Sequence, residues 1–147
     1  MKKKKKILLV EDNPDDAELV LLSMESKKIE SDINIINNGE QALDFLMCKG
    51  QYINRDINDL PDLVLLDLKL PKKSGVEVLK EIRKNETTKY LPVVIFTSSN
   101  MEQDIKQCYI NGANSFVRKP VDFNYFQTAI EKLSNYWLVL NEKYNLE

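Results

Sequence analysis

Histidine is absent from this 147-residue sequence. Its absence excludes histidine metal sites, Ser-His-Asp and Cys-His catalysis, and acid–base chemistry carried by an imidazole of the chain itself. Cysteine occurs only twice, as Cys48 and Cys108, and the two are far apart and share no motif. We interpret them as reduced, small packing residues of a cytoplasmic protein, with redox sensing as the alternative.

Long apolar runs and a strong excess of one charge are also missing. No stretch approaches the roughly 18 apolar residues of a membrane helix, and a net charge of −2 disfavours a general nucleic-acid binder. The lysines at positions 2–6 precede only a short apolar run, which is too short for a secretory signal. We therefore expect residues 1–5 to form a solvated basic tail rather than a contact for nucleic acid or a membrane.

What the sequence does contain is an alternation of apolar runs and helical patterns. The runs expected to be strands cover residues 6–10, 32–37, 62–67, 92–97 and 114–117. One helix is expected to begin at Asp15, and others to cover 40–49, 75–84, 101–111 and 121–142, with a loop over 50–61. Leu22 in the first helix and Phe123 in the last are expected to face the core. The alternation predicts one α/β domain over residues 1–147, a doubly wound five-stranded parallel sheet with helices on both faces.

The apolar residues 63–66 lead directly into Asp67. Such a run is typical of a strand buried on both faces, and its carboxyl end emerges where open α/β sheets bind ligands. An isolated aspartate would more often simply begin a turn. Other expected strands, however, also end in polar residues, namely Glu11, Asp12, Thr97 and Lys119. If the strand order is 2-1-3-4-5, these groups meet in one cleft at the switch point of the sheet.

Three carboxylates in one cleft repel one another, and a hard divalent cation is the simplest relief. Mg²⁺ prefers oxygen ligands and typically takes one or two carboxylates together with a phosphate oxygen. With the metal present, Asp67 could attack phosphorus to form an aspartyl phosphate, while Lys119 and Thr97 bind the phosphoryl oxygens. The residue types therefore predict Mg²⁺-dependent phosphoryl transfer to Asp67.

Over nearly its whole length the chain resembles the receiver domain of two-component response regulators. The resemblance rests on Val-Glu-Asp at 10–12, Leu-Leu-Asp at 65–67 with Pro71 and Gly75, Thr-Ser at 97–98, and Lys-Pro at 119–120. It implies a flavodoxin-like, CheY-like (βα)₅ fold and a signalling phosphoacceptor rather than an ordinary enzyme. The donor would be a phosphohistidine on a sensor histidine kinase or a histidine phosphotransfer protein, so the chain needs no histidine of its own.

The resemblance also implies individual roles. Asp67 would be the phosphoacceptor, and the ligands of Mg²⁺ would be Glu11, Asp12, Asp67 and the backbone carbonyl of Lys69. Glu11 stands where many members have aspartate, which would shift the metal geometry slightly. Lys69 would lie beside the path of a hydrolytic water and alter the lifetime of the phosphorylated state. The Lys119–Pro120 peptide would be cis.

The implied conformational switch involves two residues. Phosphorylation would draw Thr97 towards the phosphoryl group and let Phe116 turn inward, reshaping the surface of the fourth helix, fifth strand and last helix. For Phe116, plain core packing is an equally favoured alternative because it ends an apolar strand.

The final segment resembles the phytochrome-partnered subgroup of single-domain regulators, in Pro-Val-Asp-Phe at 120–123, in Tyr-Trp-Leu-Val-Leu-Asn at 136–141 and in the long loop before the third strand. Five consecutive bulky residues cannot all face one core. We therefore expect a homodimer through the last helix, with a helix folded back on its own domain as the alternative. Because the chain ends after this helix, the expected output is a protein contact or a phosphate relay.

Three competing functions fit parts of the pattern. A pseudo-receiver acting only as an interaction module would not need the full set of acids, threonine and lysine. A Mg²⁺-dependent phosphohydrolase would have a second aspartate where Lys69 stands. A flavodoxin-like cofactor binder needs a phosphate-cradling loop after the first strand, where the acids of residues 11–16 would repel phosphate.

Overall fold

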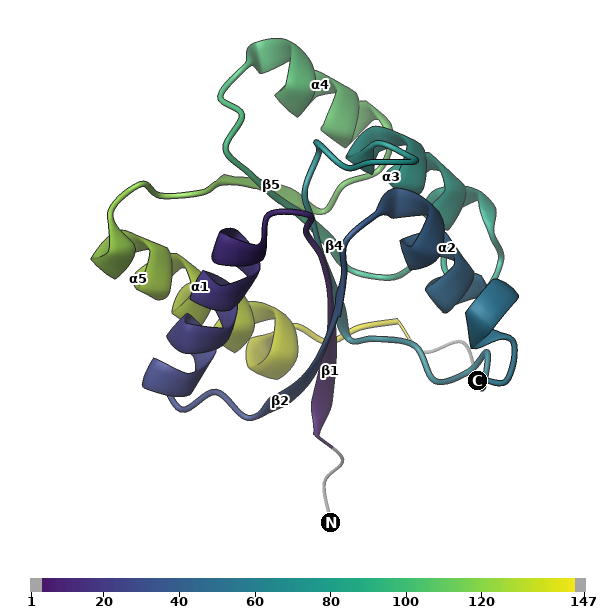
Figure 1. The fold of residues 1–147 in the computed structure, drawn as a ribbon, viewed down its shortest axis with the longest axis horizontal. Coiled ribbons are helices and arrows are strands. Elements are labelled where there is room, and N and C mark those ends of the chain that lie inside the picture. The colour runs from purple at the N-terminus through teal and green to yellow at the C-terminus, as the bar shows by residue number, and fades with distance from the viewer. Residues whose placement is uncertain (1–3, 145–147) are drawn as a thin grey trace.

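The computed structural model describes residues 4–144. Five parallel strands form one sheet in the order β2-β1-β3-β4-β5 (Figure 1), which confirms the predicted doubly wound α/β fold. The strands are β1 (Lys5–Val10), β2 (Ser31–Ile36), β3 (Leu63–Leu66), β4 (Val93–Thr97) and β5 (Ser115–Arg118). The helices are α1 (Pro14–Ser26), α2 (Gly39–Met47), α3 (Gly75–Lys84), α4 (Glu102–Ile110) and α5 (Phe123–Ser134), with a short 3₁₀ helix η1 (Gly50–Tyr52) and a π-helical segment η2 (Asn135–Leu140).

Helices cover both faces of the sheet. Figure 1 shows α1 and α5 side by side on one face, and α2, α3 and α4 on the other. The central strands β1, β3 and β4 are buried on both faces, which is why their sequences are nearly continuous apolar runs. This arrangement brings the carboxyl ends of all five strands to one edge.

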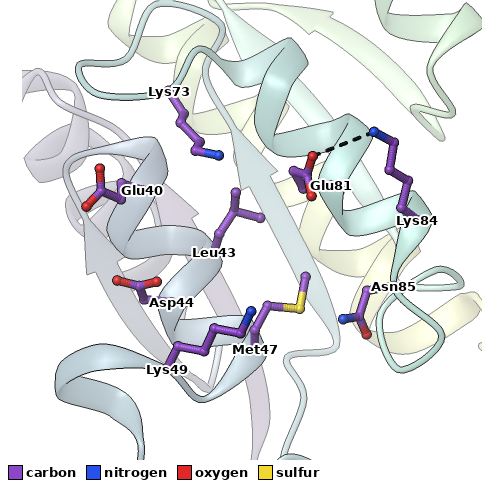
Figure 2. Close-up of a pocket in the computed structure, with 9 residues that line it drawn as sticks. All are labelled: Glu40, Leu43, Asp44, Met47, Lys49, Lys73, Glu81, Lys84 and Asn85. Atoms are coloured by element: carbon purple, nitrogen blue, oxygen red, sulfur yellow. Dashed lines mark ion pairs between the residues drawn. The ribbon is translucent and has the colours of Figure 1, made fainter.

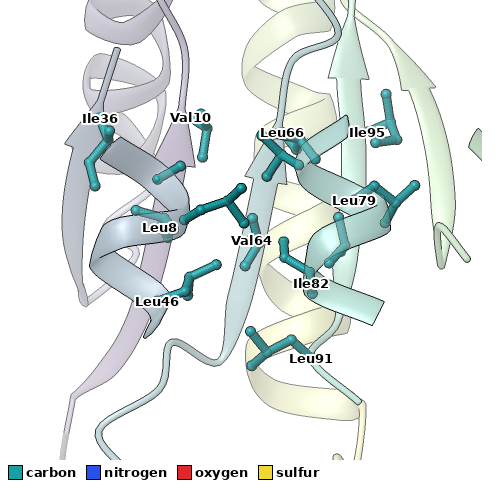
Figure 3. Packing of buried hydrophobic residues seen from close by; sticks show 14 of the residues in the cluster. Leu8, Val10, Ile36, Leu46, Val64, Leu66, Leu79, Ile82, Leu91 and Ile95 are labelled. Carbon is teal, nitrogen blue, oxygen red and sulfur yellow. The ribbon is translucent and has the colours of Figure 1, made fainter. Parts of the chain in front are cut away.

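The core is divided by the sheet into two layers. On the α2–α3 side, the strand residues Leu8, Val64 and Ile95 pack against Leu46 and Ile82 of the helices (Figure 3). The layer on the α1–α5 side includes buried Ile7, Leu65, Phe96, Phe126 and Ile130. Fully buried aliphatic side chains on both faces hold the strand ends, and hence the loops that follow them, in fixed positions.

Four of the five described α-helices begin with a side-chain cap, and only α4, whose N-cap residue is Met101, lacks one. Asn13 caps α1 by accepting hydrogen bonds from the backbone N–H groups of Asp15 and Asp16 at 2.9 and 3.2 Å. Ser74 caps α3 in a reciprocal capping box with Glu77. These caps satisfy the free N–H groups at the helix starts and fix the loops between strand and helix.

Two core expectations are wrong. Leu22 of α1 and Phe123 of α5 each leave 43% of their surface exposed. The buried face of α1 is set by Ala17, Val20 and Met24, which lie three or four residues apart, and Leu22 points away from it. Phe123 is the first residue of α5 and precedes the part of the helix that reaches the sheet.

The last helical turns widen before the chain becomes extended. After Ser134 the helix continues as the π-helical segment η2, in which Leu138 is buried while Val139 and Leu140 are exposed. Of the expected basic tail, Lys5 belongs to β1, and residues 1–3 lie outside the described residues. None of the helices within residues 4–144 is long and apolar enough to cross a bilayer.

Candidate functional site

The polar residues singled out at the strand ends line a single cleft of about 520 Å³. Glu11 and Asp12 follow β1, Asp67 follows β3, Thr97 is the last residue of β4, and Lys119 follows β5. Lys69 lines the same cleft. The structure therefore brings together six of the seven residues named from the sequence, and the seventh, Phe116, lies elsewhere.

The backbone fixes Asp67 at the centre of this cleft. Its N–H donates to the carbonyl of Val10 at 3.1 Å, which ties the end of β3 to the end of β1. Its own Oδ1 accepts a hydrogen bond from the N–H of Leu68 at 2.7 Å. The N–H of Gly75 then donates to the carbonyl of Leu68 at 2.9 Å, so the start of α3 closes the loop beside the carboxylate.

Three carboxylates of the cleft are placed to share a cation. One oxygen from each of Glu11, Asp12 and Asp67 lies within 4.8 Å of the other two. Glu11 and Asp67 are buried, whereas Asp12 is exposed at the mouth of the cleft. A set of hard oxygen donors that opens to solvent on one side fits Mg²⁺, which retains some of its waters when bound.

Lys119 forms ion pairs with three acids of the cleft. Its Nζ lies 2.6 Å from Oε1 of Glu11, 2.8 Å from Oδ2 of Asp67 and 2.8 Å from Oδ2 of Asp16. Asp16, in the first turn of α1, was not identified as a site residue from the sequence. The available signal was its place at the start of the helix that leaves β1 at the carboxyl edge, where its side chain can reach the cleft.

The two buried carboxylates differ in their protonation behaviour. Burial raises the pKa of Glu11 to about 7, although its hydrogen bond and charge interaction with Lys119 oppose the shift. Burial also acts to raise the pKa of Asp67, but Lys119, with hydrogen bonds from Glu11 and Thr97, more than offsets it, so this pKa lies below the usual value. Asp67 is therefore an ionised carboxylate at neutral pH, which is the form that can act as a nucleophile.

The pKa of Lys119 is raised, which keeps this group charged. Burial alone would lower it, but the hydrogen bonds to Asp16, Asp67 and Glu11 outweigh burial. The ammonium is therefore a permanent positive charge inside the cleft, held next to the nucleophile.

Two further features were implied by the resemblance, the cis Lys119–Pro120 peptide and the switch residue Phe116. The first is not observed, and the second lies outside the cleft. No peptide bond among residues 4–144 is cis, so the expected cis Lys119–Pro120 peptide is not observed and the chain keeps the lower-energy trans isomer there. Phe116 is half-buried in β5 and packs against the core layer on the α2–α3 side.

A second hollow of about 390 Å³ lies between α2 and α3 (Figure 2). Leu43 and Met47 line it together with three lysines and three carboxylates, including the Lys84–Glu81 pair at 3.7 Å. None of the site residues named from the sequence lines this hollow, and its charges balance one another.

Comparison with known proteins identifies relatives over nearly the whole chain. Residues 7–131 match the family model described as the response regulator receiver domain. The probable methanogenesis regulatory protein FilR2 of Methanothrix harundinacea is 37% identical over 135 residues, which cover 92% of this chain and 84% of that protein. Response regulator Rcp1 of Synechocystis is 37% identical over 134 residues, covering 91% of this chain and 89% of Rcp1.

Solved structures agree in fold over the same length. The phosphorylated cyanobacterial phytochrome response regulator RcpA superposes with a TM-score of 0.90 at 33% identity, covering 97% of this chain and 100% of RcpA. The Mn²⁺-bound form of Rcp1 gives a TM-score of 0.87 at 35% identity, covering 96% and 99% of the two chains. With an acidic cluster at the carboxyl edge of a matching fold, and a family model that spans most of the sequence, this chain belongs to the family of response regulator receiver domains.

Proposed function

We propose that this chain is a stand-alone response regulator in which Asp67 accepts a phosphoryl group from a partner histidine kinase. Receiver domains are signalling phosphoacceptors rather than ordinary enzymes, and Mg²⁺-dependent phosphorylation of an aspartate is general in the family. The observation that carries the proposal is the environment of Asp67. This buried, ionised carboxylate lies 2.8 Å from the Lys119 ammonium and within reach of a cation that Glu11 and Asp12 would share.

The residues of the cleft divide the work of phosphoryl transfer. Glu11, Asp12 and Asp67 would hold Mg²⁺, with the backbone carbonyl of Lys69 as a further ligand. When bound, Mg²⁺ would neutralise the acids and orient a phosphoryl oxygen. One oxygen of Asp67 forms the new O–P bond as the N–P bond of the donor phosphohistidine breaks, and the electron pair of that bond stays on the imidazole nitrogen.

Lys119 and Thr97 complete the site. The Lys119 ammonium already faces Oδ2 of Asp67 and would bind an oxygen of the incoming phosphoryl group in a charge-assisted hydrogen bond. Thr97, at the end of β4, lines the same cleft as Asp67 and would donate its hydroxyl to a second oxygen. Positioning and charge neutralisation of this kind are the main requirements of phosphoryl transfer.

Signalling would pass through Thr97 and Phe116 to the surface formed by α4, β5 and α5. The weak attachment of α4 supports this route, because Cys108 is its only buried residue. Phe116 pairs with Ile95 in the sheet, two residues before Thr97 in the neighbouring strand. A movement of Thr97 towards the phosphoryl group would therefore change the packing next to Phe116 and under α4.

The finer partner assignments are part of this proposal. RcpA is described as a phytochrome response regulator, and its similarity over 97% of this chain supports a phytochrome-type kinase as the donor, with a histidine phosphotransfer protein as the alternative. Reduced thiols and a histidine kinase partner also support a cytoplasmic location. Residues 1–147 would act as a single receiver unit, without nucleic acid or membrane as a partner.

A homodimer through α5 and η2 is the proposed assembly. Tyr125, Val139 and Leu140 each leave about 70% of their surface exposed, and all three lie on these two adjoining segments. Exposed apolar side chains that gather in this way can mark a contact surface for another protein. A second copy, with the same apolar side chains, would cover them around a two-fold axis. A sedimentation mass that stays monomeric at every concentration would exclude this dimer.

Intact mass after incubation with acetyl phosphate tests the phosphoacceptor. We expect one phosphoryl group to be added to the wild type in the presence of Mg²⁺, and none with EDTA or in Asp67→Asn. Asp44→Asn, which changes a carboxylate of the α2–α3 hollow, is the matched control and should be labelled normally. Absence of labelling under every condition would favour a pseudo-receiver that signals only by binding.

A further inference from the structure

The third contact of Lys119 is not explained by phosphoryl transfer to Asp67. An ammonium has three hydrogens, and here they meet three carboxylates: Glu11 and Asp67 at the strand ends and Asp16 on α1. The Asp16–Lys119 contact joins residues 103 positions apart in sequence. It is the link between the start of α1 and the loop that follows β5.

Asp16 differs from the other two acids in its relation to the metal. Glu11 and Asp67 belong, with Asp12, to the group whose oxygens lie within 4.8 Å of one another, and Asp16 does not. A divalent cation would therefore draw the two shared carboxylates towards itself and away from the ammonium. Of the three carboxylates that contact Lys119, Asp16 would then be the one that does not also bind the metal.

We propose that Asp16 is a positioning residue, which holds the Lys119 ammonium at the phosphoryl-binding side of the cleft once Mg²⁺ has engaged Glu11 and Asp67. The inference rests on the proposed function of Asp67 as phosphoacceptor. A lysine side chain has a flexible four-carbon stem, and an ammonium without a fixed partner would sample several positions. With Asp16 as an anchor, Lys119 keeps one hydrogen bond in place and offers its other hydrogens to the phosphoryl oxygens.

If Asp16 acted only by stabilising the start of α1, its replacement and that of Asp15 would have similar effects. Any acid in the first turn favours a helix through its dipole, and Asp15 next to it has the same charge in the same turn. Asp15 is exposed, whereas the side chain of Asp16 is only 24% exposed and is directed at Lys119. Asp15→Asn is therefore the matched control, because it removes the same charge from the same helical turn but not the contact with Lys119.

The first measurement is the rate of phosphorylation by phosphoramidate at saturating Mg²⁺, followed by intact mass. In Asp16→Asn we expect the maximal rate to fall about tenfold, with a smaller change in the donor concentration that gives half the maximal rate. Asp15→Asn should stay within about twofold of the wild type. Asp16→Glu, which retains a carboxylate, should recover most of the lost rate.

The second measurement needs no phosphodonor. The side-chain ammonium resonance of Lys119 in ¹⁵N-labelled protein, assigned by its loss in Lys119→Met, should be sharp in the Mg²⁺-bound wild type, Asp15→Asn and Asp16→Glu. It should broaden or disappear in Asp16→Asn, because the exchange of its hydrogens with water becomes faster. An unchanged resonance together with an unchanged rate in Asp16→Asn would overturn the inference. If the wild type is not phosphorylated but the resonance behaves as expected, the proposed function fails, whereas the anchoring of the Lys119 ammonium by Asp16 is still shown.

Discussion

A Cβ atom on Gly75 would lie 2.2 Å from the carbonyl oxygen of Asp67. This separation is far shorter than any normal van der Waals contact, and the atoms that a Cβ would meet belong to the backbone of Asp67 and Leu68, which cannot move aside as a flexible side chain could. The first residue of α3 can therefore approach the loop after β3 only because it has no side chain. The close approach lets the N–H of Gly75 donate to Leu68 and holds the backbone of Asp67 in place.

Gly75→Ala is accordingly expected to destabilise the protein and displace Asp67. Separation of α3 from the loop should cost about 1–3 kcal/mol, as overpacking of a tight interior does. Urea unfolding followed by circular dichroism measures this cost. Lys80→Ala, on the exposed face of the same helix, should stay within about 0.5 kcal/mol of the wild type. Equal stability of the two variants would mean that the loop relaxes freely.

Lys119→Met is expected to leave two buried carboxylates without their cation. The side chains of Glu11 and Asp67 are only 2% and 9% exposed, so their charges would be poorly hydrated. Loss of one partner from a buried ionic group typically costs about 3–5 kcal/mol. Urea unfolding at pH 8 in EDTA should show this loss, and Mg²⁺ should restore part of it by supplying another positive charge. Lys106→Met, on the exposed surface of α4, is the control, and a similar response of both variants to Mg²⁺ would contradict the prediction.

Mg²⁺ should remove the loss of stability that the metal-free protein shows as the pH rises. The pKa of Glu11 is raised from 4.5 to about 7, so the native metal-free protein binds this proton more tightly than the unfolded chain does. The stability that Glu11 contributes is therefore complete below 4.5 and is lost as the pH rises through about 7. Mg²⁺ requires the ionised carboxylate, so the increase in Tm that it causes should grow over the same range. Thermal unfolding between pH 5 and pH 8 measures both trends, and Glu11→Gln should weaken the metal-free one.

The fold and much of the site could be predicted because both depend on short-range sequence patterns. Buried parallel strands are continuous apolar runs, and the polar residue that ends each run marks the carboxyl edge, as at Asp67 and Thr97. Asp16 escaped prediction because its partner, Lys119, is distant in sequence and the two meet only when α1 packs beside α5. The exposure of Leu22 was missed because the apolar positions of the first helix were assigned to one broad face, whereas the buried face of α1 is narrower and Leu22 lies outside it.

The two cysteines are expected to differ sharply in reactivity. Cys108 is fully buried in α4, and burial, with a smaller effect of Asp104, raises its thiol pKa to about 11. The thiolate that reacts with disulfide reagents is therefore scarce and inaccessible in the native protein. Titration with Ellman's reagent at pH 8 should detect Cys48, which is half-buried, well before Cys108. Cys48→Ser and Cys108→Ser assign the two phases, and equal rates in the native protein would show that α4 opens readily.

Lys69 is expected to set the lifetime of the phosphorylated state. It is exposed and lines the cleft with Asp67, so its long side chain can cover a path by which water would reach the phosphoryl group. Lys69→Ala should open this approach and shorten the lifetime, without changing which residue is phosphorylated. Loss of the phosphoryl group, followed by intact mass after removal of the donor, measures the rate, and Lys80→Ala serves as a control for removing an exposed lysine elsewhere. Identical decay in Lys69→Ala and the wild type would show that water reaches the phosphoryl group by a path that Lys69 does not cover.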